Sequence, residues 1–195
     1  FPTRRSSDLD LKPSNVLCVG DCVKVVDFGV ATAIGNAYNI AGTLEYMAPE
    51  VLLGEKPSAA ADLYSFGVMA CELLSEQYPF DRSSATRFLA DVLAPQDLHK
   101  IQEQWNVIKI VSTKLKPSSG MPSAAQPDEH RNAVLERVGP GALREVVRRL
   151  LARRPEERFA SAEAVLEALT VATGESFGAA TASTSECFLQ AARRA

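Results

Sequence analysis

The sequence predicts a mainly α-helical domain with a small β-hairpin near its beginning. Two short valine-rich runs lie on either side of Gly20-Asp21, a pair that favours the tight turn between antiparallel strands. Further along, apolar residues recur at helical spacing in three segments, 58–74, 141–151 and 161–169. The 195 residues are 46% hydrophobic, which is enough to bury one ordinary core.

Charge and composition argue against several classes of partner. The net charge of −3 gives no electrostatic reason to expect a nucleic acid or an anionic membrane. No apolar run approaches the roughly 20 residues that a membrane span needs. The four cysteines are scattered without a Cys-x-x-Cys pair, so we expect reduced packing cysteines and a cytoplasmic protein.

Four polar residues lie close to the two ends of the expected hairpin. Asp10, Lys12 and Asn15 precede its first strand, and Asp27 follows its second strand. Because a hairpin reverses the chain, Asp27 should return beside the loop that carries Asp10 and Asn15. Carboxylate and amide oxygens are the ligands that Mg²⁺ prefers, so the sequence predicts a magnesium site at the open end of the hairpin.

The run from Asp10 to Glu50 resembles the catalytic loop and activation segment of a eukaryotic-like Ser/Thr protein kinase of the bacterial type. It contains Asp-Leu-Lys-Pro-Ser-Asn at 10–15, Asp-Phe-Gly at 27–29 and Ala-Pro-Glu at 48–50. The alternative is an unrelated hairpin with the same spacings. The resemblance implies a protein-kinase-like C-terminal lobe that uses ATP and Mg²⁺ to phosphorylate a protein substrate.

The resemblance assigns a role to each matching residue. Asp10 is the implied catalytic base, and Lys12 is the implied ATP-binding residue that neutralises the transferring phosphoryl group. Asn15 and Asp27 are the implied Mg²⁺ ligands. Thr43 resembles a threonine that hydrogen-bonds back to the base and the lysine, which together with Lys12 favours Ser/Thr over Tyr as the acceptor.

Two further residues belong to the activation segment. Gly29 ends the Asp-Phe-Gly motif and has an implied structural role. Thr32 lies in an expected exposed loop, 30–40, and is a candidate phosphosite because a phosphate can order such a loop through an arginine. The alternative is an unmodified loop, since the position of the arginine that would receive the phosphate falls within residues 1–9, which we interpret below as an artefactual scar.

The resemblance covers residues 10–170, which correspond to the larger kinase lobe without its first helices. The sequence contains no Gly-rich phosphate-covering loop, no strand lysine followed by a helix glutamate and no hinge segment. We therefore expect the N-terminal lobe to be absent and the chain alone to be inactive. Residues 1–9 resemble a translated sequencing-adapter primer, which indicates an artefactual scar; a natural basic, serine-rich start is the alternative.

A short helix and a long helix should follow the activation segment. Pro49 suits the first turn of the short helix, and Gly54 suits its end. Ser58 can cap the long helix, which is apolar nearly all round and should therefore be buried, with Leu73 and Leu74 facing inward.

The motif around Asp62 resembles the central helix of protein kinases. It implies that Asp62 is a buried carboxylate that accepts backbone N–H bonds from the catalytic loop. The alternative is an acidic residue that the dipole of the helix N-terminus favours.

Residues 81–140 have the least regular pattern. Residues 86–93 look helical, and 98–115 are mixed and include Trp105, on a stripe that could be core or a docking surface. Residues 116–132 are rich in proline, serine and alanine, which indicates a loop or disorder.

The last two expected helices are amphipathic. In 141–151 we expect the three arginines, Arg144, Arg148 and Arg149, to form a solvated face. Ser161 should cap the second helix, in which four residues should face inward: Ala162, Val165, Leu166 and Leu169.

The turn between these helices contains Arg158, which resembles the kinase arginine that pairs with the glutamate ending the activation segment, here Glu50. From 171 to 195 the composition indicates a linker or a disordered tail. The end of the tail, 186–193, resembles the join to a following ATPase domain in large bacterial signalling kinases, and an ordinary tail is the alternative.

Two functions from different classes fit the sequence. The first is a Ser/Thr protein kinase whose present segment carries most of the catalytic motif. The second is a non-catalytic kinase-like interaction module of a larger signalling protein. The four motif residues Asp10, Lys12, Asn15 and Asp27 are all present, which favours the enzyme.

Overall fold

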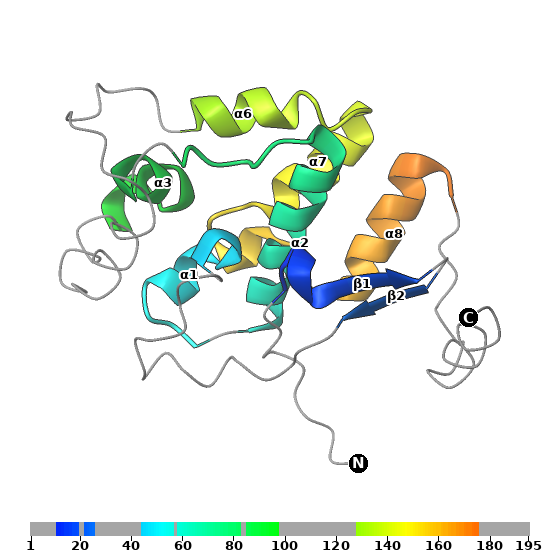
Figure 1. Cartoon of the computed structure of the whole chain (residues 1–195), viewed down its shortest axis with the longest axis horizontal. Helices are drawn as coiled ribbons and strands as arrows, with labels where there is room; N and C mark the ends of the chain where they lie inside the picture. Colours follow the sequence, from blue (N-terminus) through cyan, green and yellow to red (C-terminus); the bar gives the residue numbers. More distant parts are fainter. Residues whose placement is uncertain are drawn as a thin grey trace, which may run out of the picture.

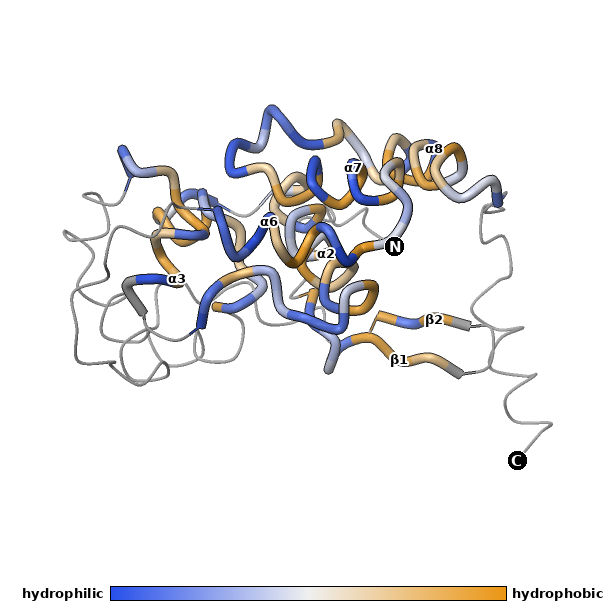
Figure 2. The backbone as a smooth tube through the Cα atoms, turned by 90° about the horizontal axis from the view of Figure 1, so that it is seen from above, coloured by the Kyte–Doolittle hydropathy of each residue, from blue (hydrophilic) through white to orange (hydrophobic). Residues whose placement is uncertain are grey.

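The protein is helix-rich with one two-stranded antiparallel sheet, as the sequence predicts (Figure 1). The computed structural model describes residues 11–19, 22–25, 44–56, 58–82, 85–97 and 128–175. Helix α2, Ala59–Ser75, lies at the centre, with α3, Ala85–Val92, on one side and α8, Ala162–Thr173, on the other (Figures 1 and 2).

Three further α-helices and four short 3₁₀ helices complete the described part. The α-helices are α1 Pro49–Leu52, α6 Glu129–Leu135 and α7 Gly141–Leu150. The 3₁₀ helices are η1 Pro13–Asn15, η3 Leu44–Tyr46, η4 Pro95–Asp97 and η5 Pro155–Glu157.

The predicted hairpin consists of β1, Val16–Val19, and β2, Cys22–Val25. Val16 lies opposite Val25 and Val19 opposite Cys22, so two residues separate the paired strands, as a tight turn requires. Leu17 and Val23 are exposed although both are apolar. The hairpin is therefore only partly covered by the rest of the described chain.

Helix α2 forms where the sequence places it. The Ser58 side chain accepts a hydrogen bond from the backbone N–H of Ala61, which satisfies one of the free donors of the first turn. At Gly67, an added Cβ would lie 2.6 Å from the Cβ of Leu150. Glycine therefore lets α2 and α7 approach closely, and only a residue without a side chain fits there.

The end of α2 differs from the prediction. Leu73 is 77% exposed and Leu74 is 44% exposed, whereas the sequence suggested that both face the core. Spacing along a helix shows which residues share a face, but it does not show how far a neighbouring element extends along that face.

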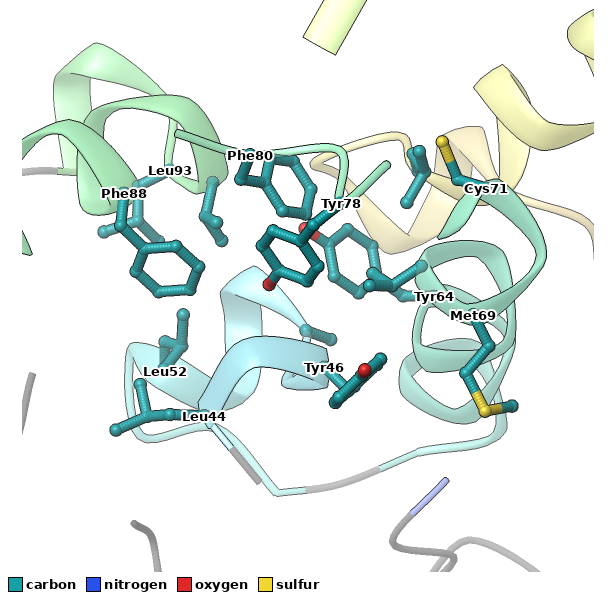
Figure 3. Close-up of a cluster of buried hydrophobic side chains, with 14 of the residues drawn as sticks. Leu44, Tyr46, Leu52, Tyr64, Met69, Cys71, Tyr78, Phe80, Phe88 and Leu93 are labelled. Carbon is teal, nitrogen blue, oxygen red and sulfur yellow. The ribbon is translucent and has the colours of Figure 1, made fainter. Parts of the chain in front are cut away.

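Two hydrophobic clusters stabilise the helices. The larger one is rich in aromatic residues, and Figure 3 shows Tyr64, Tyr78 and Phe80 side by side within it. The rings of Tyr64 and Phe80 are stacked with centroids 6.2 Å apart. The smaller cluster joins α2, α7 and α8 through Leu63, Leu150 and other buried residues. Hydrophilic and hydrophobic residues alternate along α7, as expected of a helix packed on one side (Figure 2).

Two helix boundaries differ from the sequence prediction. Residues 129–132 belong to α6, whereas the composition of 116–132 suggested a loop or disorder. Helix α8 continues through Thr173 and ends at Gly174, which has a φ of 72°. Composition averaged over a window does not resolve a short helix that tertiary packing stabilises. Residues 98–127, with Trp105, lie outside the described residues.

The inward face of α8 is narrower than predicted. Val165 is buried as expected, but Ala162 is exposed and Leu166 is 37% exposed. In the smaller cluster α8 packs against residues of α2 and α7 and against Phe159, and residues at the edge of its apolar stripe remain in contact with solvent.

The cysteine prediction is confirmed at one position. Cys71 is a free, buried residue of the larger cluster, and burial raises the pKa of its thiol to about 11. It is therefore a packing residue and not a reactive thiolate at neutral pH. Cys18, in contrast, is free and exposed. Among the described residues, no group of histidine, cysteine, aspartate and glutamate side chains is arranged to hold a metal ion.

Candidate active site

The described part of the predicted catalytic loop is the compact turn η1. Lys12 precedes the turn with an extended backbone, and Pro13 occupies its first position, where a fixed φ favours helical geometry. The backbone N–H of Asn15 donates to the carbonyl of Lys12 at 2.9 Å. Lys12 and Asn15 therefore lie at the two ends of this turn, directly before β1.

Asn15 is a buried polar residue, with 7% of its surface exposed. It comes directly before Val16, which pairs with Val25 at the open end of the hairpin. A polar side chain is buried only where its surroundings satisfy its hydrogen bonds, so its position is well defined. Lys12, by comparison, is partly exposed.

The other predicted residues of the catalytic loop and activation segment lie outside the described residues. They are Asp10, Asp27, Gly29, Thr32 and Thr43. The structure therefore describes the part of the predicted site contributed by Lys12 and Asn15, together with the segment that follows Thr43.

Glu50, in the short helix α1, forms a buried ion pair with Arg158. Arg158 donates from Nη1 to Oε1 of Glu50 and from Nη2 to Oε2 of Glu50, both at 2.7 Å. Arg158 is 2% exposed and Glu50 is 6% exposed. The contact expected between these two residues is present, with the two parallel hydrogen bonds that an arginine and a carboxylate can form.

Arg158 also makes three bonds to backbone carbonyls that the sequence does not reveal. Its Nε donates to Ala152 at 2.8 Å, Nη1 donates to Ala60 at 2.8 Å, and Nη2 donates to Arg153 at 3.1 Å. With the two bonds to Glu50, all five N–H groups of the guanidinium are used. Arg158 thus joins α1, the first turn of α2 and the α7–α8 connection.

Asp62 lies in the first turn of α2 and is partly buried. The resemblance implied a buried carboxylate, and Asp62 is only partly buried. A position in the first turn agrees with the favourable interaction between a carboxylate and the helix N-terminus. The bond from the catalytic loop to Asp62 remains a prediction.

The segment directly after Thr43 is anchored on α2. The hydroxyl of Ser65 donates to the carbonyl of Tyr46 at 2.7 Å, and the hydroxyl of Tyr46 donates to Oε2 of Glu72 at 2.8 Å. The hydroxyl of Tyr78 donates to the carbonyl of Glu45. Burial, followed by the bond to Glu72, raises the pKa of Tyr46 above its ordinary range, so this tyrosine remains a donor.

These anchoring residues were missed by the sequence analysis. Tyr46 stands inside the recognised motif, but its partners Ser65 and Glu72 come from a separate helix. The spacing of seven residues between Ser65 and Glu72 places them on one face of α2, which is a signal that pattern reading could have used.

Comparison with known proteins identifies the family to which this chain is similar. A family model described as "Protein kinase domain" matches residues 7–169. The match includes residues 7–9, which the sequence analysis assigned to an artefactual scar.

None of the described helices is long and apolar enough to span a membrane.

Three relatives illustrate the similarity. The serine/threonine-protein kinase Pkn1 of Myxococcus xanthus is 35% identical over 178 residues, which are 85% of this chain and 21% of the relative. A cGMP-dependent protein kinase of Eimeria tenella is 42% identical over 89 residues, or 44% of this chain and 9% of the relative. A putative mitogen-activated protein kinase kinase kinase 7-like protein of Drosophila melanogaster is 43% identical over 74 residues, 36% of this chain and 19% of the relative. The chain spans about a fifth or less of the length of these relatives.

Proposed function

The chain belongs to the protein kinase family, and we propose that it forms the catalytic-loop lobe of a Ser/Thr protein kinase that transfers the γ-phosphoryl group of ATP to a protein hydroxyl. The observation that carries the proposal is the turn η1, which holds Lys12 and the buried Asn15 directly before the hairpin. A kinase needs these two side chain types at this spacing for phosphate and metal binding.

In this proposal the roles follow the chemistry of each side chain. Asp10 accepts the proton of the substrate hydroxyl, and Thr43 hydrogen-bonds to the base and to Lys12. The ammonium group of Lys12 lies against the transferring phosphoryl group, where its positive charge offsets the negative charge of the oxygens. Most of the rate enhancement then comes from positioning and from charge neutralisation.

The donor set fits Mg²⁺. The side chains of Asn15 and Asp27 would hold the metal through an amide oxygen and a carboxylate oxygen, both hard ligands. Asn15 is buried at the end of the hairpin where Val16 and Val25 pair, and Asp27 follows Val25 by two residues in the sequence. Bound Mg²⁺ neutralises phosphate charge and orients the phosphoryl group.

The proposal also concerns the residues that hold the α- and β-phosphates of ATP. These 195 residues contain no Gly-rich loop and no strand lysine to hold the α- and β-phosphates. We therefore expect no measurable phosphate transfer from labelled Mg-ATP to a generic basic protein by this chain alone. Transfer that Asp10→Asn abolishes would contradict this expectation.

The central test uses a longer parent chain that includes an ATP-covering lobe. Asp27→Ala should lower phosphate incorporation at least about a hundredfold, because it removes a charged metal ligand, while the circular dichroism spectrum stays unchanged. Glu167→Gln, at an exposed position of α8, is the control and should leave the rate unchanged.

The outcomes separate the two functions. Normal phosphate transfer by Asp27→Ala would overturn the Mg²⁺ assignment. A parent chain that neither binds ATP nor transfers phosphate would favour a non-catalytic kinase-like interaction module instead.

A further inference from the structure

A cleft of about 480 Å³ lies between the end of α3 with η4 on one side and the α7–η5 connection on the other. Four of the ten described residues that line it are arginines: Arg131, Arg148, Arg153 and Arg154. Among these described lining residues, Glu157 is the only acidic one. None of the ten is assigned to phosphoryl transfer.

The two inner arginines, Arg131 and Arg153, contact the same carboxylate. Arg153 donates to both oxygens of Asp128, at 2.6 and 3.1 Å, and Nη2 of Arg131 forms an ion pair with Oδ1 of the same carboxylate at 2.9 Å. Two guanidinium groups thus share one carboxylate. Their side chains are only 16% and 18% exposed, so water screens the remaining charge less than it would at an open surface.

Two observations indicate that the inner pair is not fully satisfied. The Nε–H of Arg153 is buried and has no hydrogen-bond partner among the described residues. Burial lowers the pKa of Arg131, and the nearby charge of Arg153 lowers it further, while the carboxylates of Asp128 and Asp91 act in the opposite direction. An additional anion in the cleft would stabilise both cations.

The outer arginines are accessible to a ligand. Arg148 is 48% exposed, and its one ion-pair partner among the described residues is Glu145, itself 65% exposed, at 2.7 Å. Arg154 is exposed, and no ion pair joins it to another described residue. An exposed pair such as Arg148–Glu145 is weak, so Arg148 can exchange its partner for a ligand at little cost.

We propose that this cleft binds an acidic peptide segment of a protein partner. Guanidinium groups bind carboxylates and phosphates through paired hydrogen bonds, and four of them converge on a volume typical of ligand sites. Ala94, Pro95 and Ala152 line the same cleft with short side chains, which leaves room for an extended backbone. A long nucleic acid is disfavoured by the net charge of −3 on the whole chain.

The proposal goes beyond the proposed function, because binding at this cleft requires no phosphoryl transfer. The anionic groups can be aspartate and glutamate carboxylates or a phosphate on a serine. Both place oxygen atoms in pairs that match the guanidinium fork. Parallel measurements with both kinds of peptide distinguish the two sources.

The test measures fluorescence anisotropy of a labelled ten-residue Asp/Glu peptide, with and without one phosphoserine, titrated with the 195-residue chain. Arg154→Gln should weaken binding about fivefold, and Arg148→Gln/Arg154→Gln should weaken it further. Arg137→Gln removes an exposed arginine that does not line the cleft and is the matched control. It should leave the dissociation constant unchanged.

Each outcome decides the proposal. Stronger binding of the phosphoserine peptide would assign the cleft to a phosphorylated partner, and equal binding would show that carboxylates suffice. Equal affinities for the wild type and both cleft variants would overturn the proposal, as would equal binding of a neutral Asn/Gln peptide. Displacement of the peptide by a short single-stranded RNA at lower concentration than by unlabelled peptide would assign the cleft to nucleic acid instead.

Discussion

The two described parts of the candidate site are held by contacts of very different range. In η1, the bond from Asn15 to Lys12 joins residues three positions apart. In contrast, the bonds from Arg158 to Glu50 join residues 108 positions apart. The first arrangement is set by local backbone geometry, whereas the second exists only once α1, α2 and the α7–α8 connection have packed together.

This difference predicts where substitutions cost most. A local contact can form before the rest of the domain and is partly retained when the domain unfolds. A buried contact between distant segments is lost completely on unfolding, and removing one partner of a buried ion pair leaves an uncompensated charge inside the folded protein. Long-range contacts should therefore dominate the free energy of unfolding.

The largest effect is expected from Arg158→Ala. The substitution leaves the Glu50 carboxylate buried without its partner and frees three carbonyls, so it should lower the free energy of unfolding by about 3 to 5 kcal/mol. Urea unfolding followed by circular dichroism measures it. A midpoint equal to that of the wild type would show that this pair does not hold the activation segment in place.

A double variant sharpens this prediction. Glu50→Ala/Arg158→Ala removes both charges together, so it should cost less than the sum of the two single variants. Additive costs would mean that the two residues act independently despite their contact.

The second effect concerns the approach of α2 to α7. Gly67→Ala would bring a methyl group within 2.6 Å of the Leu150 Cβ, and we expect a loss of about 1 to 3 kcal/mol. Gly141→Ala is a matched control, because nothing lies within 4 Å of a Cβ added there. Thermal unfolding of both variants compares them, and equal midpoints would contradict the close approach of the two helices.

A smaller effect is expected from a local contact at the start of α8. The Ser161 side chain accepts from the N–H of Ala164 at 3.3 Å, so Ser161→Ala should cost about 1 kcal/mol. Ser161→Thr keeps the acceptor and should retain most of the stability. If Ser161→Ala matched Arg158→Ala in its urea midpoint, the distinction between local and long-range contacts would fail.

The smallest effect is expected from Arg148→Ala. Its bond to Glu145 joins neighbouring turns of α7, and both side chains are about half exposed or more. The change in the free energy of unfolding should stay below about 0.5 kcal/mol. A larger loss in urea unfolding would indicate that Arg148 supports the fold and does not merely line the cleft.

Local patterns were sufficient to predict several elements. Gly20-Asp21 between valine-rich runs predicted the hairpin, and Ser58 and Ser161 predicted the starts of α2 and α8, because turns and helix caps depend on a few adjacent residues. The pairing of Glu50 with Arg158 was predicted from a resemblance to protein kinases and could not have come from spacing alone.

The tertiary structure alone decided features that depend on neighbours distant in the sequence. Arg149 is exposed, as expected of a solvated face, but its guanidinium also lies 4.3 Å from the centre of the Phe159 ring; Arg144, in contrast, is only 25% exposed and bonds to Glu136. Leu73 was expected in the core and is exposed. The sequence by itself determined where several helices and strands begin and end, because caps and turns depend on local backbone geometry. It also determined which residue types carry the chemistry. Only packing determined which faces are covered and how four arginines come to line one cleft, because burial depends on the arrangement of segments that no local pattern encodes.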